Sequence, residues 1–264
     1  MRGAKTKLVV AGAGGKMGRT LIEAVLADKS LLLAAAFDVK GSPAVGTAIG
    51  GVKVRSDAAA AIGMGDVLID FTRPEGTLAH LGICVRLGKA MVIGTTGVDE
   101  AGQARIKSAS KQISIVMAPN FAVGVNVVFK LAAQAAEILG DEYDVEIIDA
   151  HHRHKVDAPS GTALMLGQLI SKSLNRNLNT VAAHGRHGDT GVRPRKQIGF
   201  HAIRGGDIVG EHTVIFAGTG ERVEVTVRSQ SRMTYALGAL RAARFLRGKR
   251  SGLYGIWDVL GKGE

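Results

Sequence analysis

The densest group of chemically reactive side chains in this 264-residue chain is the run from Asp149 to Thr162. Five consecutive basic residues stand in it: His151, His152, Arg153, His154 and Lys155. Arginine and lysine bind carboxylates through paired or point-charge contacts, and histidine or lysine can move a proton near neutral pH. The run therefore predicts a site that binds a small anionic molecule and transfers protons.

The end of this run offers a second anion-binding feature. Ser160, Gly161 and Thr162 stand where a helix is expected to begin, and the first turn of a helix presents backbone amides and partial positive charge. A metabolite with two carboxylates needs two cationic clamps, which the basic residues and this helix start can supply. We expect a small-molecule dicarboxylate substrate.

A metal site is the alternative interpretation of the histidines. Metal ions need neutral imidazoles, and the neighbouring Arg153 and Lys155 oppose a bound cation. The chain has no HExxH motif and no cysteine pair. We therefore expect no metal; a solvated basic loop without function stays open as the other alternative.

A glycine-rich turn is the second candidate site. The apolar run Leu8–Ala11 leads into Gly12-Ala13-Gly14-Gly15-Lys16-Met17-Gly18, and a helical pattern follows. Glycines there allow a tight turn and a close approach to a pyrophosphate. Met17 stands where the GxGxxG pattern has its last glycine, so the spacing is instead GxxGxxG. Asp38, 20 residues past Gly18, can accept hydrogen bonds from ribose hydroxyls. Together these features predict dinucleotide binding.

The type of dinucleotide is less sharply indicated. Asp38 by itself favours NADH, because its carboxylate would repel a 2′-phosphate, whereas Lys16 and Lys40 offset that repulsion. We expect NADPH and NADH both to be used. Thr72 and the run Gly94-Thr95-Thr96 end later strands, at the sheet edge where such folds bind ligands.

Apolar runs and helical patterns alternate through the first half of the chain. The expected strands are Leu8–Ala11, Leu31–Phe37, Val67–Phe71, Met91–Ile93 and Ile113–Ala118. Four helices are expected: Lys16–Ala27, Ala58–Ile62 with Ser56 as its cap, a helix that starts near Pro74 and includes Gly76–Leu87, and a helix that starts at Asp99 or Glu100. The stretch Gly41–Gly51 is expected to be a loop. Repeated units of this length predict an α/β fold with a Rossmann-type, doubly wound parallel sheet.

The second half of the chain has a different pattern. Expected there are a helix Asn126–Leu139, a strand Tyr143–Ala150, a helix Thr162–Ser173, an irregular polar stretch Asn175–Lys196, and one antiparallel sheet from Ile198–Ile203, Ile208–Phe216 and Glu221–Val227. A last helix, Met233–Leu246, is expected to return to the first domain. We predict a dinucleotide-binding domain, 1–122 with 232–264, and a second α+β domain with a mostly antiparallel sheet, 123–231.

Composition limits the classes of function. The net charge is +11, but the basic residues are scattered and aromatic residues make up only 4%, which argues against nucleic-acid binding. The single cysteine, Cys84, suits a reducing compartment. Only about five apolar residues follow the basic start of the chain, and no run approaches the ~20 residues of a membrane span. We expect a soluble, cytoplasmic protein without a membrane partner.

Several motifs together cover nearly the whole chain. They are Val10–Gly18, Asp70–Pro74, Gly94–Gly97, Ala118–Asn126, Ala150–Ala163, Ile198–Phe200 and Arg204–His212. In these runs the chain resembles the 4-hydroxy-tetrahydrodipicolinate reductase (dihydrodipicolinate reductase) family of bacterial diaminopimelate and lysine synthesis. The run His151–Thr162 is the most specific of them.

The resemblance implies an NADPH- or NADH-dependent reduction of 4-hydroxy-tetrahydrodipicolinate to tetrahydrodipicolinate, with loss of water. It implies that His151 is the general acid and that Lys155 is a second proton donor and a carboxylate contact. The implied substrate contacts are His152, Gly161 and Thr162. The implied cofactor contacts are Gly12, Ala13, Gly14, Gly15, Lys16, Met17, Asp38, Gly94, Thr95, Thr96, Ala118, Pro119, Asn120 and Phe121. A homotetramer built through the second-domain sheets is also implied.

One position departs from the family pattern. Many members carry an arginine directly after the acidic residue of the second strand, as a ligand of the 2′-phosphate. This chain has Val39 there, followed by Lys40. A strong preference for NADPH is therefore not expected. The alternative function from another class is a redox sensor that binds NAD(P)H without turnover, which would not need the basic run His151–Lys155.

Overall fold

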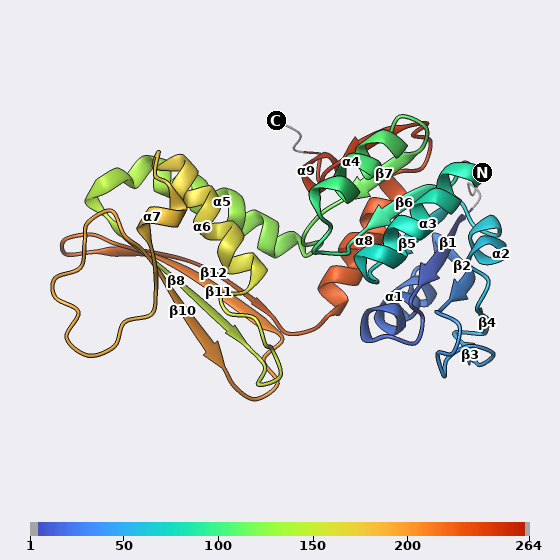
Figure 1. The fold of residues 1–264 in the computed structure, drawn as a ribbon, viewed down its shortest axis with the longest axis horizontal. Coiled ribbons are helices and arrows are strands. Elements are labelled where there is room, and N and C mark those ends of the chain that lie inside the picture. Colours follow the sequence, from blue (N-terminus) through green and yellow to red (C-terminus); the bar gives the residue numbers. More distant parts are fainter. Residues whose placement is uncertain (1–4, 262–264) are drawn as a thin grey trace. The chain divides into compact units, whose positions relative to one another are not determined.

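The computed structural model describes residues 5–261. It separates into two compact units, one containing the residues up to Ala122 and those from Arg232 onward, the other Val123–Ser231 (Figure 1). We call them unit 1 and unit 2. Residues 1–4 and 262–264, which the sequence analysis assigned to the first domain, lie outside the described residues.

Unit 1 is built on an eight-stranded sheet. In order across the sheet, its strands are β13 (Gly252–Tyr254), β7 (Ser114–Met117), β6 (Ala90–Ile93), β5 (Val67–Asp70), β1 (Thr6–Ala11), β2 (Leu31–Phe37), β4 (Val52–Arg55) and β3 (Ala48–Ile49). All neighbours pair in parallel except β3 and β4. The doubly wound parallel sheet is thus confirmed, and the short β3 lies inside the stretch expected to be a loop.

Helices cover both faces of this sheet. Alternate residues of β1 enter different cores: Leu8 and Val10 pack with helices α1 (Lys16–Ala27) and α8 (Met233–Phe245), whereas Val9 and Ala11 pack with the helices of the other face. Those are α2 (Ala58–Gly63), α3 (Pro74–Leu87) and α4 (Glu100–Ala109). Because successive side chains of a strand point to opposite faces of the sheet, each strand contributes to two apolar layers.

The C-terminal segment belongs to unit 1, as α8 packs against α1 and β13 extends the sheet beside β7. Close approach is built into this packing, because a Cβ on Gly238 would lie 1.8 Å from the carbonyl oxygen of Phe121. Strand β13 and the short α9 (Ile256–Val259) were not predicted from the sequence.

The helix starts of unit 1 follow their capping residues. Pro74 opens α3, and the carboxylate of Asp99 caps α4 by accepting from the amide of Gly102 at 2.8 Å. The expected cap at Ser56 is wrong. The cap of α2 is Asp57, whose carboxylate accepts from the amide of Ala60 at 3.0 Å, because the helix begins one residue past the serine's reach.

Unit 2 has a five-stranded sheet with its helices on one face (Figure 1). The strand order is β12 (Arg222–Ser229), β11 (Gly210–Ala217), β8 (Asp144–His151), β10 (Ile198–Arg204) and β9 (Ala182–His184). The helices are α5 (Val123–Leu139), the 3-10 turn η1 (Gly140–Glu142), α6 (Gly161–Ser173) and the short α7 (Leu178–Val181).

The sheet of unit 2 is mixed. Strand β11 is antiparallel to both β12 and β8, whereas β10 pairs in parallel with β8 and with β9. The expectation that β10 joins β11 and β12 in one antiparallel run is therefore wrong for β10. Helix α6 lies between β8 and β10 in the chain, and a helical crossover returns the next strand in the parallel sense.

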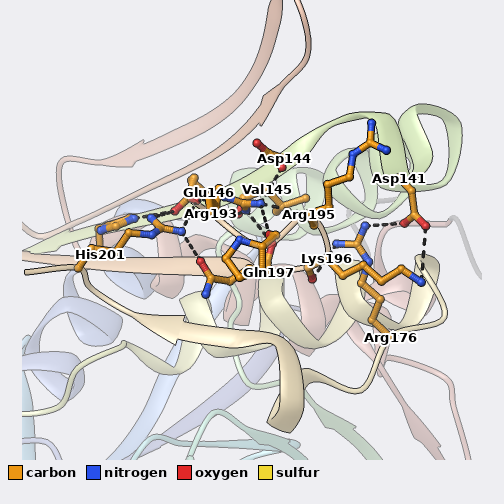
Figure 2. A network of polar contacts seen from close by, with 12 residues as sticks. Asp141, Asp144, Val145, Glu146, Arg176, Arg193, Arg195, Lys196, Gln197 and His201 are labelled. Atoms are coloured by element: carbon orange, nitrogen blue, oxygen red, sulfur yellow. Dashed lines mark hydrogen bonds and ion pairs between the residues drawn. The ribbon is translucent and has the colours of Figure 1, made fainter. Parts of the chain in front are cut away.

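The polar stretch that the sequence left unexplained is held to β8 by ion pairs (Figure 2). Arg186 donates to Glu146 at 2.9 and 3.1 Å, Arg193 bonds Glu146 and Asp144, and His201 contacts Glu146 at 2.7 Å. Burial of Glu146 acts to raise its pKa, but these partners outweigh it and lower the pKa to about 2. The loop over 185–197 is thus anchored by a carboxylate that stays ionised across the neutral range.

One helical stretch, Val123–Glu142, meets a membrane-span criterion by length and composition, which the sequence analysis did not expect. It buries Val125, Val128, Phe129, Ala132 and Ala136 against its own unit, and it packs on α6, β11 and β12. The share of its apolar window that is buried is 33%, and a single such stretch is weak evidence for a membrane.

Candidate active site

The glycine-rich turn follows β1 as predicted, and each glycine of its spacing has a backbone reason. Gly12 has a φ of +67°, which favours glycine. A Cβ on Gly18 would lie 2.1 Å from the carbonyl oxygen of Gly12, so the turn packs directly on α1. Gly15 is the N-cap of α1 and makes no side-chain capping bond. The turn thus brings a helix N-terminus, unobstructed by side chains, to the carboxyl edge of the sheet, which suits an anionic group.

Asp38 follows β2 and contacts the same turn. Its carboxylate accepts hydrogen bonds from the amide of Gly14 and the amide of Val39, both at 2.8 Å. Gly14 leaves no space there, since a Cβ would lie 2.8 Å from the carboxylate. The acidic residue is therefore held beside the glycine turn, and Val39 next to it is 73% exposed.

A pocket of about 720 Å³ opens where β1, β2 and β5 end. Gly12, Gly15, Asp38 and Thr72, which the sequence analysis singled out, line it. Val39, the position discussed for cofactor preference, also lines it, together with groups that were not predicted: Phe37, Ser56, Ala58, Phe71, Arg73, Glu75, Gly76 and His80. Its volume and its mixture of apolar and polar lining residues suit a small organic ligand.

A buried polar network supports this pocket. Asp70 is fully buried at the end of β5 and accepts from the backbone and hydroxyl of Thr72, from the hydroxyl of Thr77 and, at 2.7 Å, from the ring of His80. Thr95 is also buried, with its hydroxyl 2.7 Å from that of Thr77. The Thr95 side chain is committed to this network, so Thr95 has only its main chain to offer a cofactor.

The remaining predicted cofactor residues gather at the same edge of the sheet. Gly94 follows β6, and its amide donates to the carbonyl of Asp70 at 2.8 Å. Ala118 follows β7 and donates to the carbonyl of Ile93 at 3.3 Å. The rings of Phe121 and Phe71 lie 5.5 Å apart. The structure thus places Gly94–Thr96 and Ala118–Phe121 on neighbouring strand ends, whereas Lys16 is exposed on the first turn of α1.

The basic run of unit 2 begins at the end of β8, where His151 is the last residue of the strand. Its side chain is 12% exposed, and its Nδ1 lies 3.8 Å from a carboxylate oxygen of Asp149. Burial, reinforced by the charge of Lys155, lowers the pKa of His151, while Asp149 acts to raise it. A group so placed can exchange a proton near neutral pH.

Lys155 stands in the loop after β8. Its ammonium bonds both carboxylate oxygens of Asp157 at 2.8 Å and is 20% exposed. Gly161 and Thr162 are the first residues of α6, and the hydroxyl of Ser160 caps that helix by accepting from the amide of Ala163 at 3.2 Å. In unit 2 the catalytic candidates and the predicted helix start therefore follow the carboxyl end of β8.

His152 lies beside the catalytic candidates, directly after the end of β8. Its ring is 6.2 Å from that of His154, and its Nδ1 is buried without a hydrogen bond among the described residues. This buried nitrogen is therefore left without a partner inside unit 2 among the described residues.

Three side chains behind His151 were not assigned a role from the sequence. Asp149 is buried and accepts from Arg204 at 3.0 Å and from the amide of Ser160 at 2.6 Å. His212, opposite Asp149 on β11, bonds the hydroxyl of Ser160 at 3.1 Å. No local pattern marks this set, because its members come from three strands and a helix start.

Asp149, His151 and His212 form one group whose ligand atoms lie within 4.8 Å of one another, close enough for a metal ion. The donor set argues against a cation. Arg204 already occupies Asp149, and the ammonium of Lys155 opposes positive charge at His151. The expected absence of a metal stays a prediction.

Comparisons with known proteins match both units. A family model described as dihydrodipicolinate reductase, N-terminus, matches residues 6–121, and one described as dihydrodipicolinate reductase, C-terminus, matches residues 124–260. The 4-hydroxy-tetrahydrodipicolinate reductase of Dechloromonas aromatica (strain RCB) is 57% identical over 97% of this chain and 98% of that protein. The same-named protein of Cupriavidus metallidurans (strain ATCC 43123 / DSM 2839 / NBRC 102507 / CH34) is 55% identical over 97% of the chain and 99% of its own length.

A solved structure has the same fold. The dipicolinate-bound dihydrodipicolinate reductase from Paenisporosarcina sp. TG-14 superposes with a TM-score of 0.78 at 24% identity, covering 96% of this chain and 99% of that one.

Proposed function

Since the chain belongs to the dihydrodipicolinate reductase family, we propose a division of labour in which unit 1 binds the nicotinamide cofactor and unit 2 binds the substrate and supplies the proton. The activity is that of a 4-hydroxy-tetrahydrodipicolinate reductase, an NAD(P)H oxidoreductase of lysine biosynthesis. The alternative of a redox sensor without turnover is set aside by this membership. The observation that carries the proposal is the placement of the basic run of unit 2 at one strand end, beginning with a largely buried histidine.

The reaction sets the requirements of the site. The 4-hydroxyl first leaves as water together with a hydrogen of the neighbouring carbon, which gives an unsaturated ring. The bound cofactor would supply hydride to C4 of that ring, and a proton is then taken up. Electrons displaced by the hydride move toward C3 and the ring nitrogen, so a positioned acid lowers the barrier, by roughly a hundredfold or more. The carboxylates of the substrate bring negative charge that a cationic site must offset.

The residues of unit 1 fit a dinucleotide. The amides of Gly12–Met17 at the start of α1 would hold the pyrophosphate, and Asp38 would accept from the ribose hydroxyls. The positive φ of Gly12 and the absence of room for a Cβ on Gly18 support this assignment, because the first allows the tight turn and the second lets α1 pack closely against it. The cofactor, NADPH or NADH, supplies the hydride.

We expect both cofactors to be used. Asp38 disfavours a 2′-phosphate, and the exposed Val39 offers it no charged contact, whereas Lys16 and Lys40 lie near enough in sequence to offset the carboxylate. Initial rates with NADH and NADPH side by side test this. A ratio above about a hundredfold in favour of NADPH would contradict the assignment made for Asp38 and Val39.

In unit 2, His151 is proposed as the general acid and Lys155 as a second proton donor and carboxylate contact. His152 and the amides of Gly161 and Thr162 complete the substrate contacts. The ion pair of Lys155 with Asp157 shows that the lysine is already directed to a carboxylate, which a substrate carboxylate can replace.

The roles are tested by comparing Lys155→Ala and His151→Gln with the wild type in a steady-state assay. We expect both to lower kcat by about a hundredfold or more, with a rise in KM for Lys155→Ala alone. Asp144→Asn, at the opposite end of β8, is the matched control and should leave turnover unchanged. Full turnover in either active-site variant would overturn its assigned role.

A homotetramer in the cytoplasm completes the proposal. The face of the unit 2 sheet that points away from the helices carries Ile148, Ile203 and Ile215, of which Ile203 is 52% exposed. The same face also carries Glu146, His201 and Thr213, so it is mixed rather than apolar, and the tetramer is proposed from the family membership together with these isoleucines. Sedimentation of the wild type and of Ile203→Glu tests it: a tetramer that the charge disrupts is expected, and a monomeric wild type would overturn it. The single, buried Cys84 supports the cytoplasmic assignment.

A further inference from the structure

His151 presents its two ring nitrogens to different surroundings. Asp149 precedes it by two residues on β8, so both side chains lie on one face of the strand. The Nδ1 atom is buried, lies 3.8 Å from the Asp149 carboxylate, and makes no hydrogen bond within residues 5–261. With Nδ1 directed inward, Nε2 is the nitrogen left to meet a ligand.

The carboxylate behind His151 is held as an anion. Burial acts to raise the pKa of Asp149, but hydrogen bonds from Ser160 and Arg204 outweigh it, and the pKa lies below its ordinary value. Arg204 also donates to the main-chain carbonyl of Asp157 at 2.7 Å. One guanidinium therefore fixes both the carboxylate and the loop that carries Lys155.

A second histidine, His212, packs against the His151 ring beside Asp149. The two rings meet edge-on with centroids 5.2 Å apart. Burial first, and the neighbouring His151 second, lower the pKa of His212 to about 4. His212 thus adds no positive charge near neutral pH. The charged groups that act on His151 are Lys155 and Arg204, which disfavour its protonation, and Asp149 and Asp157, which favour it.

We propose that Asp149 is a positioning residue for the reductase reaction, which aims Nε2 of His151 at the substrate and stabilises its imidazolium form through Nδ1. The inference rests on the proposed role of His151 as the acid. When the Nε2–H bond breaks, its proton passes to the substrate and the Nδ1–H stays beside the carboxylate. Without Asp149, burial and two cations would leave His151 uncharged over more of the neutral range.

The pH profile of Asp149→Asn separates positioning from a structural role. Loss of the carboxylate lowers the pKa of His151, so the fraction of active acid falls most on the alkaline side. We expect kcat to fall by roughly tenfold or more near pH 8 and clearly less near pH 6. Asp144→Asn removes a carboxylate from the same strand and should keep the wild-type profile. An Asp149→Asn profile that is lowered equally at every pH, or not at all, would overturn the proposal.

A measurement on the wild type covers the case in which Asp149→Asn does not fold. Nitrogen NMR of the neutral His151 ring, assigned by comparison with His151→Gln, is expected to show the proton on Nδ1. A proton on Nε2 would overturn the positioning role. Full turnover in His151→Gln would instead remove the acid role itself. The two failures are distinguishable, because the tautomer is read without turnover.

Discussion

Replacing His212 with glutamine should remove a large part of the acid sensitivity of unit 2. His212 is 4% exposed, and its pKa falls from an ordinary 6.5 to about 4. At about 1.4 kcal/mol per pKa unit, this depression corresponds to about 3 kcal/mol. The unfolded chain binds a proton at this residue between those two pH values, whereas the folded chain does not. The folded state therefore has the full contribution above pH 6.5 and loses it as the pH falls toward 4.

Glutamine suits the test because its side-chain amide can reach the hydroxyl of Ser160, which the ring contacts at 3.1 Å, and it does not titrate. Urea denaturation at a series of pH values gives the free energy of unfolding of both proteins. Hydrogen exchange of peptides from β8 and β11 assigns the change to unit 2. As the pH is lowered from neutral to 4, the wild type is expected to lose about 3 kcal/mol more free energy of unfolding than the variant. Parallel pH dependences would refute the neutral, buried state of His212.

Three further outcomes are expected. Gly18→Ala should reduce the free energy of unfolding by about 1–3 kcal/mol and weaken cofactor binding, because its Cβ would lie 2.1 Å from the carbonyl oxygen of Gly12. Calorimetry measures the stability and cofactor titration the affinity; an unchanged affinity would contradict the account. Cys84 should react with a thiol reagent only on unfolding, since burial raises its pKa to about 12; rapid labelling of the native protein would be the opposite result. Glu146→Gln should speed hydrogen exchange in residues 185–197, because Arg186 and Arg193 lose their shared carboxylate, and an unaltered exchange pattern would argue against that anchor.

Local patterns predicted those features whose causes are local. The glycine spacing placed the turn after β1, because Gly12 needs its positive φ and Gly18 has no room for a side chain. Asp38 was predicted from its separation in sequence from the glycine turn, because one helix and one strand of ordinary length lie between the turn and this residue. The error at Ser56 concerned a single residue of register, since Asp57 is an equally good cap in chemical terms.

The features that sequence reasoning missed depend on pairing between distant segments. Strand β10 was predicted to be antiparallel from its neighbours in the sequence, but its partner and direction are set by the helical crossover from β8. His80 meets Asp70 only because α3 packs over the end of β5. Asp149, Arg204 and His212 come together across three strands, and each alone is an ordinary polar residue.

The central claim is that a cofactor site on unit 1 and a basic site on unit 2 serve one reduction. The most direct test follows oxidation of NADPH and NADH with substrate generated in place from pyruvate and aspartate semialdehyde by the preceding synthase. We predict oxidation with both cofactors that requires the synthase, is slowed by Gly18→Ala through weaker cofactor binding, and falls by about a hundredfold or more in Lys155→Ala. Oxidation that persists without the synthase, or that runs at the wild-type rate in the Lys155→Ala protein, would contradict the account.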